Sequence, residues 1–347
     1  MISDIQVENI RSYNRIESVA GEFVSLYPAN GFLAGQCPCC HDAAPTFIVD
    51  PRKQTFTCFH CGFSGDVFAF VQNAYGISYK EAAEALAKRA GLQFTDEPEP
   101  EMIPKTRAIL LKMNKQAAKY YIGNLRKSRK GKEYIKEREL SEETVKSFGI
   151  GYANGYDNDL TKYLKYLGYS EEQIIMAGLG VQGEHGIRDK YRERIMFPIV
   201  NTDKKVVGFG GRTIIPDAKP KYINSPDTLV FDKSSNLFGI NTVIPGKPII
   251  LCEGYMDVIQ MQQWGFNGVA SLGTAFTSLQ AKLLRKYTDT VILSYDNDGP
   301  GQIALKRAAG ILEKFGLNYK KLELMPAKDP DEFLKKFGKE EFEKRLS

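Results

Sequence analysis

The sequence predicts an α/β fold, α+β overall, in which a small zinc ribbon precedes a larger region built on a parallel sheet. One observation is the apolar run Ile249–Cys252, which ends on Glu253. A second apolar run, residues 290–293, is followed closely by Asp296 and Asp298. Such runs are typical of buried parallel strands, whose C-terminal ends form the ligand-binding edge of an open α/β sheet. The third observation is a double cysteine motif near the N-terminus.

The three carboxylates Glu253, Asp296 and Asp298 are expected to converge at one sheet edge. Like charges a few Å apart raise one another's pKa, so the three stay ionised together only beside a cation. Hard oxygen ligands suit Mg²⁺ or Mn²⁺, and Mg²⁺ is usually shared with substrate phosphates. The alternative, that each acid caps a helix or lies in a solvated loop, explains any one of them better than it explains the set.

Composition sets the outer limits. The chain of 347 residues has 43% hydrophobic and 26% charged residues, which fits two or three globular domains. It contains no apolar run of about 18 residues and no basic, apolar N-terminal start, so neither a membrane helix nor a secretory signal is predicted and the expected compartment is the cytoplasm. The net charge of +5 is too small to indicate a partner.

The cysteines indicate one structural zinc ion. Cys37 and Cys40 form one pair, Cys58 and Cys61 form another, and seventeen residues separate the pairs. This is the spacing of a zinc ribbon, in which two knuckles complete a tetrahedron. Three residues adjoin the proposed ligands and could replace one of them, although the four cysteines are favoured: Cys39, His41 and His60. Buried free thiols are the non-metal alternative.

Short elements are predicted around the cysteines. Residues 46–49 and 54–57 are expected as strands joined by a turn at Asp50-Pro51, and helices are expected after Gly65-Asp66 and over residues 78–90. Residues 95–106 are expected to form a linker, acidic and proline-rich over 95–101, that lets the zinc domain move. Six residues of the first domain could stack bases or hold phosphates of a single strand, unless the aromatic ones are core: Phe47, Arg52, Lys53, Phe56, Phe59 and Phe63.

Residues 105–138 hold most of the positive charge. They contain twelve Lys or Arg against two acids, a local net of +10 that is twice the charge of the whole chain. Part of this segment, residues 106–125, has an apolar stripe of helical period made by Ile109, Leu110, Met113, Ala117, Tyr120 and Tyr121. The segment is interpreted as a track for nucleic-acid phosphates; a solvated helix face is the alternative.

Two further apolar strands are predicted over residues 192–200 and 206–213, with arginines at their ends. Gly208, Gly210 and Gly211 indicate close approach of another backbone or a ligand. Residues 219–226 are expected as a non-helical loop with two lysines. Together these pieces suggest a basic wall facing the acidic cluster, as a site for nucleoside triphosphates and metal requires.

In this order, the paired cysteines and the runs Arg192–Ile199, Gly208–Arg212, Lys221–Pro226, Glu253–Asp257 and Asp296–Gly301 closely resemble the bacterial DnaG-type primases over about residues 1 to 345. The resemblance implies a zinc-binding domain and a primase catalytic core with a Toprim α/β subdomain. It implies Glu253, Asp296 and Asp298 as ligands of catalytic Mg²⁺ or Mn²⁺. Further acids of the cluster would be Asp257, Asp329 and Asp331, and contacts to incoming nucleotide or template would come from Arg192, Arg194, Arg212, Lys221 and Asn224.

The resemblance also implies an organisation and an activity. The expected divisions are a zinc-binding domain (1–94), a linker (95–106), a basic N-terminal subdomain of the polymerase (107–245), a Toprim subdomain (246–330) and the start of a helical segment (331–347). The expected activity is synthesis of short RNA primers on single-stranded DNA from ribonucleoside triphosphates by two-metal transfer. A cytoplasmic, nucleoid-associated monomer with no membrane contact is expected. The helicase-docking domain of full-length family members is expected to be absent, because the chain stops at Ser347.

Three departures from the family pattern stand out. Cys40 occupies a position that is commonly His, so this is an all-Cys variant. Asn297, Gly299 and Pro300 replace common residues of the acidic loop but spare both aspartates. The chain also stops at Ser347, as either a shortened chain or a short mobile-element relative. Two alternatives of other classes stay open: a Toprim nuclease or topoisomerase, and a non-catalytic zinc protein that binds single-stranded DNA.

Overall fold

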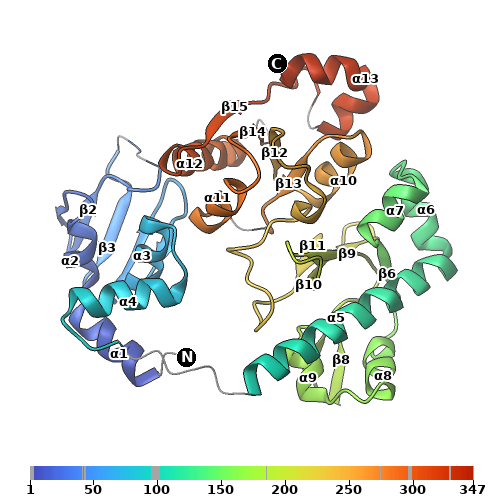
Figure 1. Ribbon diagram of the computed structural model, residues 1–347, viewed down its shortest axis with the longest axis horizontal. Coiled ribbons are helices and arrows are strands. Elements are labelled where there is room, and N and C mark those ends of the chain that lie inside the picture. Colours follow the sequence, from blue (N-terminus) through green and yellow to red (C-terminus); the bar gives the residue numbers. More distant parts are fainter. Residues whose placement is uncertain are drawn as a thin grey trace.

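The structure is a computed structural model that describes residues 4–40, 42, 44–94, 102–184, 186–273, 275–295, 299–327 and 330–346. Three sheet-centred regions follow one another along the chain (Figure 1). Within the described residues, no helix is both long and apolar enough to cross a membrane. The predicted linker falls largely outside the described residues, at 95–101.

The N-terminal zinc domain, residues 4–94, is built on a five-stranded antiparallel sheet in the order β1-β2-β3-β4-β5. Its elements are α1 (Asp4–Tyr13), α2 (Ile16–Gly21), β1 (Tyr27–Ala29), β2 (Phe32–Gly35), β3 (Phe47–Asp50), β4 (Thr55–Cys58), β5 (Ser64–Gly65), α3 (Val67–Tyr75) and α4 (Tyr79–Arg89). The two predicted strands are present as β3 and β4. The other three strands and the first two helices were not predicted, because their short segments lack a clear period.

Local capping explains where the last two helices of this domain begin. The Asp66 side chain accepts hydrogen bonds from the backbone N–H groups of Phe68 and Ala69, and thereby caps α3. Ser78 and Glu81 form the reciprocal capping box of α4. Both helices are confirmed.

The structure corrects the proposed base-stacking set. Phe47, Phe56 and Phe63 are at most 3% exposed and pack around Phe70 in the core of the zinc domain. Phe47 of β3, Phe56 of β4 and Phe63, which precedes β5, bury their rings against one another, and removal of this apolar surface from water stabilises the domain. Of the four aromatic residues, only Phe59 lies on the surface, with 76% exposure.

The middle region is a second antiparallel sheet, in the order β11-β10-β9-β6, covered by helix α5. Its elements are α5 (Met102–Lys127), α6 (Arg129–Glu137), α7 (Glu142–Phe148), β6 (Gly151–Ala153), α8 (Asp159–Tyr166), α9 (Glu171–Met176), β7 (Gly180–Gly183), β8 (Gly186–Asp189), β9 (Arg194–Val200), β10 (Val206–Thr213) and β11 (Tyr222–Asn224). Strands β7 and β8 form a separate hairpin.

Helix α5 confirms and extends the predicted amphipathic helix. Leu110, Met113, Ala117 and Tyr121 of the apolar stripe are at most 2% exposed. Residues 102–106, expected in the linker, belong instead to the first turns of α5, where Pro104 needs no helical N–H partner. The segment expected as a loop over 219–226 contains the edge strand β11, which pairs with β10.

The C-terminal region has a fully parallel sheet in the order β13-β12-β14-β15. Its elements are η1 (Ile240–Thr242), β12 (Ile249–Cys252), α10 (Tyr255–Gln263), β13 (Gly268–Ala270), α11 (Ser278–Leu284), β14 (Thr290–Ser294), α12 (Gly299–Lys314), β15 (Asn318–Lys321) and α13 (Pro330–Leu346). Every residue of β12 is buried, as the apolar run predicted. The C-terminal ends of β12 and β14 are paired side by side, and the predicted acidic residues follow these ends.

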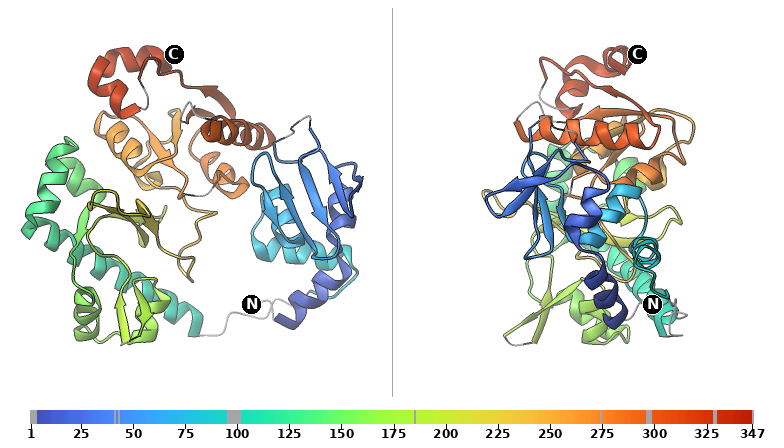
Figure 2. Two further views of the ribbon diagram at one scale, coloured as in Figure 1. Left: turned by 180° about the vertical axis from the view of Figure 1, so that it is seen from behind. Right: turned by 90° about the vertical axis from the view of Figure 1, so that its left-hand side faces the viewer.

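The zinc domain is docked on helices α11 and α12 of the C-terminal region (Figure 2). The C-terminal end of α3 supplies carbonyl groups: Ser278 donates to Asn73 O at 2.8 Å, and Lys314 donates to Ala74 O. On α12, Arg307 donates from Nη1 to Cys61 O at 2.6 Å. These donors satisfy carbonyls that the end of a helix and a tight knuckle leave without backbone partners.

Replacing Arg307 with glutamine should loosen this docking. A hydrogen bond from a charged donor contributes about 1.5–3 kcal/mol to stability. Because Arg307 is buried, with 8% exposure, loss of its guanidinium leaves Cys61 O without a donor at the contact between the two regions. We expect a larger radius of gyration in small-angle scattering. The matched control is Lys306→Gln, which removes the neighbouring exposed cation; equal scattering profiles for the two variants would contradict the prediction.

Candidate active site and zinc centre

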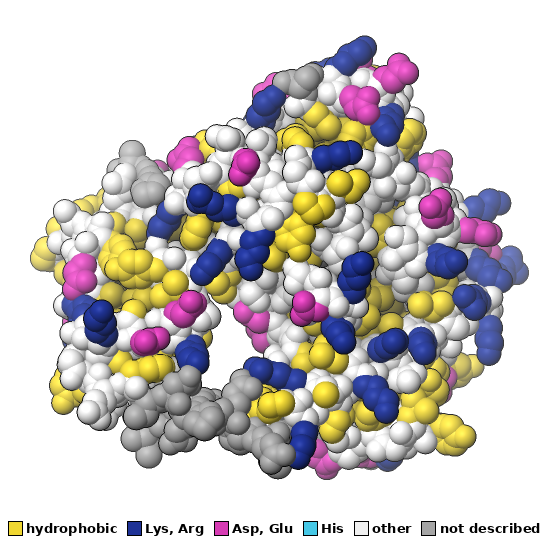
Figure 3. Space-filling model, viewed as in Figure 1, with side chains coloured by type: hydrophobic (Ala, Val, Ile, Leu, Met, Phe, Trp, Pro, Cys, Tyr) yellow, Lys and Arg dark blue, Asp and Glu magenta, His cyan; other side chains and the backbone are white. Residues whose placement is uncertain are grey.

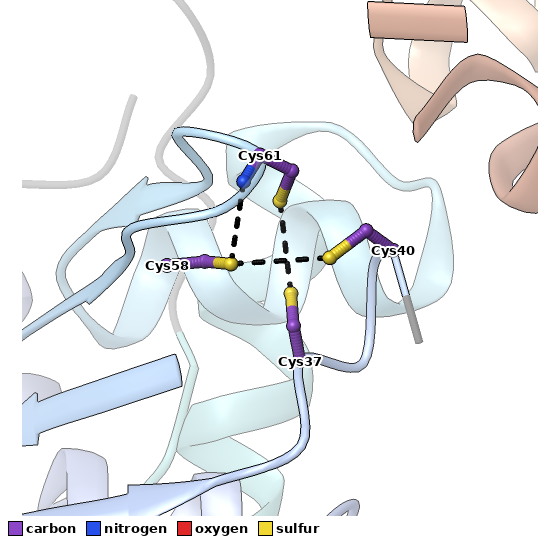
Figure 4. A group of neighbouring side chains, drawn as sticks. All are labelled: Cys37, Cys40, Cys58 and Cys61. Atoms are coloured by element: carbon purple, nitrogen blue, oxygen red, sulfur yellow. Dashed lines mark hydrogen bonds between the residues drawn. The ribbon is translucent and has the colours of Figure 1, made fainter. Parts of the chain in front are cut away.

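The four predicted cysteines form a compact cluster (Figure 4). Their Sγ atoms all lie within 4.8 Å of one another, with 3.7 Å between Cys37 and Cys61 and 3.9 Å between Cys40 and Cys58. Sulfurs at about 2.3 Å from a tetrahedral zinc lie about 3.8 Å apart, so the spacing fits the ion. Hydrogen bonding with the neighbouring thiols, chiefly Cys37, holds the pKa of Cys58 far below its ordinary value. Zinc replaces those shared protons when it binds.

The residues that adjoin the cluster have other places. Cys39 is not among the clustered ligands; it packs between the core of the zinc domain and that of the C-terminal region. His60 also lies outside the group, with Nδ1 at 3.9 Å from Asp42. His41 lies outside the described residues. Among the described residues, therefore, the metal group is the four cysteines alone.

Strand register brings the two predicted acidic runs to one edge. Cys252 of β12 lies opposite Ser294 of β14 in parallel pairing, so Glu253 and Tyr295 leave the sheet side by side. Glu253 is exposed at this edge. Burial raises the pKa of Tyr295, and the negative charge of Glu253 adds to the effect. The C-terminal edge of the parallel sheet therefore carries the negative charge of Glu253 next to the buried Tyr295.

Gly254 and Asp257 shape the turn that follows Glu253. A Cβ atom at Gly254 would lie 2.7 Å from Asp257 Oδ2, so a side chain at this position would displace the carboxylate. Asp257 lies in the first turn of α10, where a negative charge interacts favourably with the helix dipole. Glycine after Glu253 thus leaves room for two carboxylates on successive elements.

The remaining predicted acids divide into two groups. Asp296, Asp298 and Asp329 lie outside the described residues. Asp331 lies in the first turn of α13, where Lys335 Nζ donates a hydrogen bond to its Oδ2 at 3.4 Å and lies 3.1 Å from its Oδ1. Lys335 also pairs with Glu139 at 3.2 Å. The described contacts of Asp331 thus go to Lys335, and the structure does not join Asp331 to Glu253.

The predicted basic wall meets the sheet edge through Asn224. Asn224 Nδ2 donates to Leu272 O at 2.7 Å, and its Oδ1 accepts from Tyr255 OH at 2.8 Å. Leu272 follows β13 and Tyr255 follows β12, so strand β11 adjoins the C-terminal edge that carries Glu253. The sequence predicted a basic wall facing the acidic cluster, but not that Asn224, Leu272 and Tyr255 would make the contact.

Arg212 is held between two aromatic rings. Its guanidinium lies 5.4 Å from the ring centroid of Tyr134 and 5.5 Å from that of Tyr222, and it donates to Tyr222 OH at 3.1 Å. Burial raises the pKa of Tyr222 to about 12, so the hydroxyl stays protonated near neutral pH. The rings fix the direction of the cation.

The other predicted nucleotide contacts lie at different places. Arg194 donates to the carbonyls of Gly211, Pro220 and Lys221, which keeps it on the β9–β10–β11 sheet. Arg192 instead pairs with Asp157 beside the β7–β8 hairpin, in a cavity of about 790 Å³. The five predicted contacts are therefore not one cluster. Arg192 lies beside the β7–β8 hairpin, whereas the other four lie on or next to the β9–β10–β11 sheet.

Sequence reasoning missed the aromatic members of this site. A Cβ atom at Gly210 would lie 2.4 Å from the Tyr255 ring, so the group that approaches the glycine strand is an aromatic side chain. Tyr255 stacks between Phe197 and Tyr222 at 5.4 and 5.8 Å. The three glycines of β10, Gly208, Gly210 and Gly211, were the available signal, because they indicated close approach but not which group approaches.

Family models match three parts of the chain: a CHC2 zinc finger over residues 2–101, the N-terminal domain of the DNA primase catalytic core over 120–244, and a Toprim-like domain over 250–334. The DNA primase of Aquifex aeolicus is 37% identical over 352 residues, covering 100% of this chain and 69% of the relative. The chain belongs to the DnaG-type DNA primase family. The DNA primase of Clostridium acetobutylicum is 39% identical over 348 residues, which are 99% of this chain and 58% of the relative.

Solved structures of the family agree with the fold. The zinc-binding and RNA polymerase domains of the Aquifex aeolicus primase match with a TM-score of 0.64 at 36% identity, over 98% of this chain and 84% of that one. A DnaG catalytic domain bound to single-stranded DNA matches with a TM-score of 0.64 at 33% identity, over 70% and 82%. The predicted zinc ribbon, catalytic core and Toprim subdomain are confirmed. The chain spans 58% of the length of the Clostridium primase and 69% of the Aquifex primase.

Proposed function

We propose that this chain synthesises short RNA primers on single-stranded DNA by two-metal nucleotidyl transfer from ribonucleoside triphosphates. The observation that carries the proposal is the contact of Asn224 with the residues that follow β12 and β13. It sets strand β11, which is preceded by Lys221 and paired with Arg212 of β10, beside the edge that carries Glu253. A cationic wall beside carboxylates suits a triphosphate that arrives with its metal. The proposed divisions of the chain are those of the sequence analysis, except that residues 102–106 belong to helix α5 and not to the linker.

The acidic edge offers oxygen donors for Mg²⁺ or Mn²⁺. The proposed ligands are Glu253, Asp296 and Asp298, with Asp257, Asp329 and Asp331 as outer acids. Glu253 fits this role because it directly follows the buried strand β12, which holds its backbone in place, while its carboxylate is exposed to solvent. Such ions lower the pKa of an attacking hydroxyl and neutralise charge on the triphosphate.

The residues of the basic wall would bind and orient the nucleotide. Arg212, held between two rings, presents a guanidinium that cannot lose its proton at physiological pH. Asn224 has a defined amide orientation because Leu272 O accepts from its nitrogen and Tyr255 donates to its oxygen. Arg194 and Lys221 would add positive charge along the same sheet. Pre-oriented groups of this kind reduce the entropy cost of placing two nucleotides.

The basic segment is proposed as the track for the template. Eleven of its twelve cations are exposed, and Arg138 is half-buried. On α5, the residues Lys105, Lys112, Lys119 and Arg126 recur every seven positions, which places them on one face. Dark blue side chains follow the diagonal path of α5 in Figure 3. A row of cations of this kind binds phosphates without reading sequence.

Replacing Lys112, Lys115 and Lys119 together with alanine should weaken single-stranded DNA binding and its salt dependence. Each lost phosphate contact lowers the slope of log affinity against log salt by about 0.7, so the triple variant should lose about 2 in slope. Fluorescence anisotropy with a labelled oligonucleotide at several salt concentrations measures it.

The matched control replaces three exposed lysines that lie elsewhere, at Lys204, Lys247 and Lys286. This control has the same change of net charge. If both triple variants lose the same slope, binding depends on overall charge and the track on α5 is wrong.

The activity itself is tested with two parallel reactions. Template with labelled ribonucleotides and Mg²⁺ or Mn²⁺ should yield short RNA, whereas supercoiled DNA with the same protein should stay intact. Cleavage or relaxation without RNA would favour a Toprim nuclease or topoisomerase, and binding with neither product would favour a non-catalytic zinc protein. We propose that the chain acts as a monomer, and assign no residue of it to the helicase contact expected of the family.

A further inference from the structure

Glu193 lies between Arg192 and Arg194 in an unusual backbone conformation. Its φ is +49°, in the left-handed region of backbone conformation that residues other than glycine rarely adopt. Backbone bonds hold it there: Glu193 N donates to Asn154 O at 3.2 Å, and Ile214 N donates to Glu193 O at 3.2 Å. A strained residue that its surroundings fix in this way is a candidate for a functional role.

The conformation separates the two arginines. Residues i and i+2 of a regular strand point to the same face, so a continuous strand would place Arg192 and Arg194 together. Here β9 begins only at Arg194, which is bonded to carbonyls of the β10–β11 edge. Arg192 is bonded to Asp157 beside the β7–β8 hairpin. One left-handed residue thus divides an arginine pair between two surfaces.

The Glu193 side chain reaches a third surface, the basic helix α6. Its carboxylate accepts from Tyr152 OH at 2.7 Å and from Lys130 Nζ at 3.2 Å, and its side chain is 22% exposed. A Cβ atom at Gly155 would lie 2.6 Å from Glu193 Oε1, so the sequence leaves room for this carboxylate. Tyr152 is 3% exposed and provides a rigid anchor.

We infer that Glu193 is a positioning residue: its left-handed backbone holds Arg192 and Arg194 on separate surfaces, and its carboxylate ties Lys130 of the basic helix to the same point. The inference rests on the proposed function, because the separated cations would then serve template and nucleotide. Its carboxylate also neutralises Lys130, which is otherwise exposed among the cations of the proposed track. Glu193 touches no reacting atom in this scheme; it acts through its neighbours.

Glu193→Gln is the decisive variant, because it keeps the shape and removes the charge. Freed Lys130 should become available to phosphate, so the salt slope of single-stranded DNA binding should steepen by about 0.7. Primer synthesis should fall at least about tenfold, because the carboxylate no longer ties Lys130 to the residue that separates the arginines, and a small misplacement of a positioning group has effects of this size. Stronger binding with weaker synthesis is a result that simple loss of folding does not give.

Two comparisons isolate the effect. The double variant with Glu193→Gln and Lys130→Gln should return the slope to that of the wild type, while synthesis stays low. Glu171→Gln is the matched control, since Glu171 pairs with Lys165 at 2.7 Å on the surface of α9 and α8, and Lys165 is not one of the cations of the basic segment. It should change neither measurement.

The outcomes separate the inference from the proposed function. A wild-type slope for Glu193→Gln, or synthesis within about twofold of wild type, would overturn the inference. Absence of primers from the wild-type chain would overturn the proposed function. The salt slope of DNA binding by Glu193→Gln, and its return to the wild-type value in the double variant, would still show whether Glu193 neutralises Lys130. Parallel loss of binding and synthesis would show a purely structural role.

Discussion

Replacing Glu253 with glutamine should abolish primer synthesis, by at least about a thousandfold, while single-stranded DNA binding stays within about twofold of wild type. The carboxylate stands exposed at the end of β12, where it has no part in the buried core, so the fold should tolerate an amide. Glutamine cannot supply the negative charge that a divalent ion needs. Asp296→Ala should behave in the same way if Asp296 is a ligand.

Synthesis is measured by incorporation of labelled ribonucleotide on a short template, and binding by anisotropy with the same template. Glu340→Gln is the matched control, since Glu340 is an exposed carboxylate of α13. Joint loss of synthesis and binding in the Glu253 variant would count against the metal-ligand role. Retained synthesis would remove Glu253 from the active site.

Loss of one zinc ligand should produce the second large effect. Cys58→Ala removes one corner of the tetrahedron, and structural zinc contributes about 10–16 kcal/mol to the folding of small zinc domains. We expect zinc content to fall from one ion per chain to less than about a tenth of that. Backbone amides of β3 and β4 should exchange faster, whereas those of β12 and β14 should not change, because the parallel sheet has a core of its own.

Cys39→Ala is the control that the chain itself offers. Cys39 lies in the same knuckle but outside the metal group. The variant should keep one zinc ion per chain, measured by atomic emission. A loss of zinc from Cys39→Ala, or its retention in Cys58→Ala, would show that the ligand set is wrong.

Several features could be predicted from sequence because short segments determine them. The capping box of Ser78 and Glu81 depends on residues three positions apart. The paired cysteines meet because two tight knuckles turn their sulfurs inward, and β12 was evident because all four of its residues are apolar. Asp296, Asp298 and Asp329 stay predictions, since they lie outside the described residues.

The sequence by itself determined the zinc ligands, the buried strands, the basic helix and the family. Only the tertiary structure decided that Phe47 and Phe56 are core, that Tyr255 fills the space beside Gly210, and that Arg192 and Arg194 separate at Glu193. These outcomes depend on contacts between segments far apart in the chain, or on a backbone angle that such contacts hold. Spacing along a sequence records neither, because a residue type shows what a side chain can bind but not which distant surface folding will bring to it.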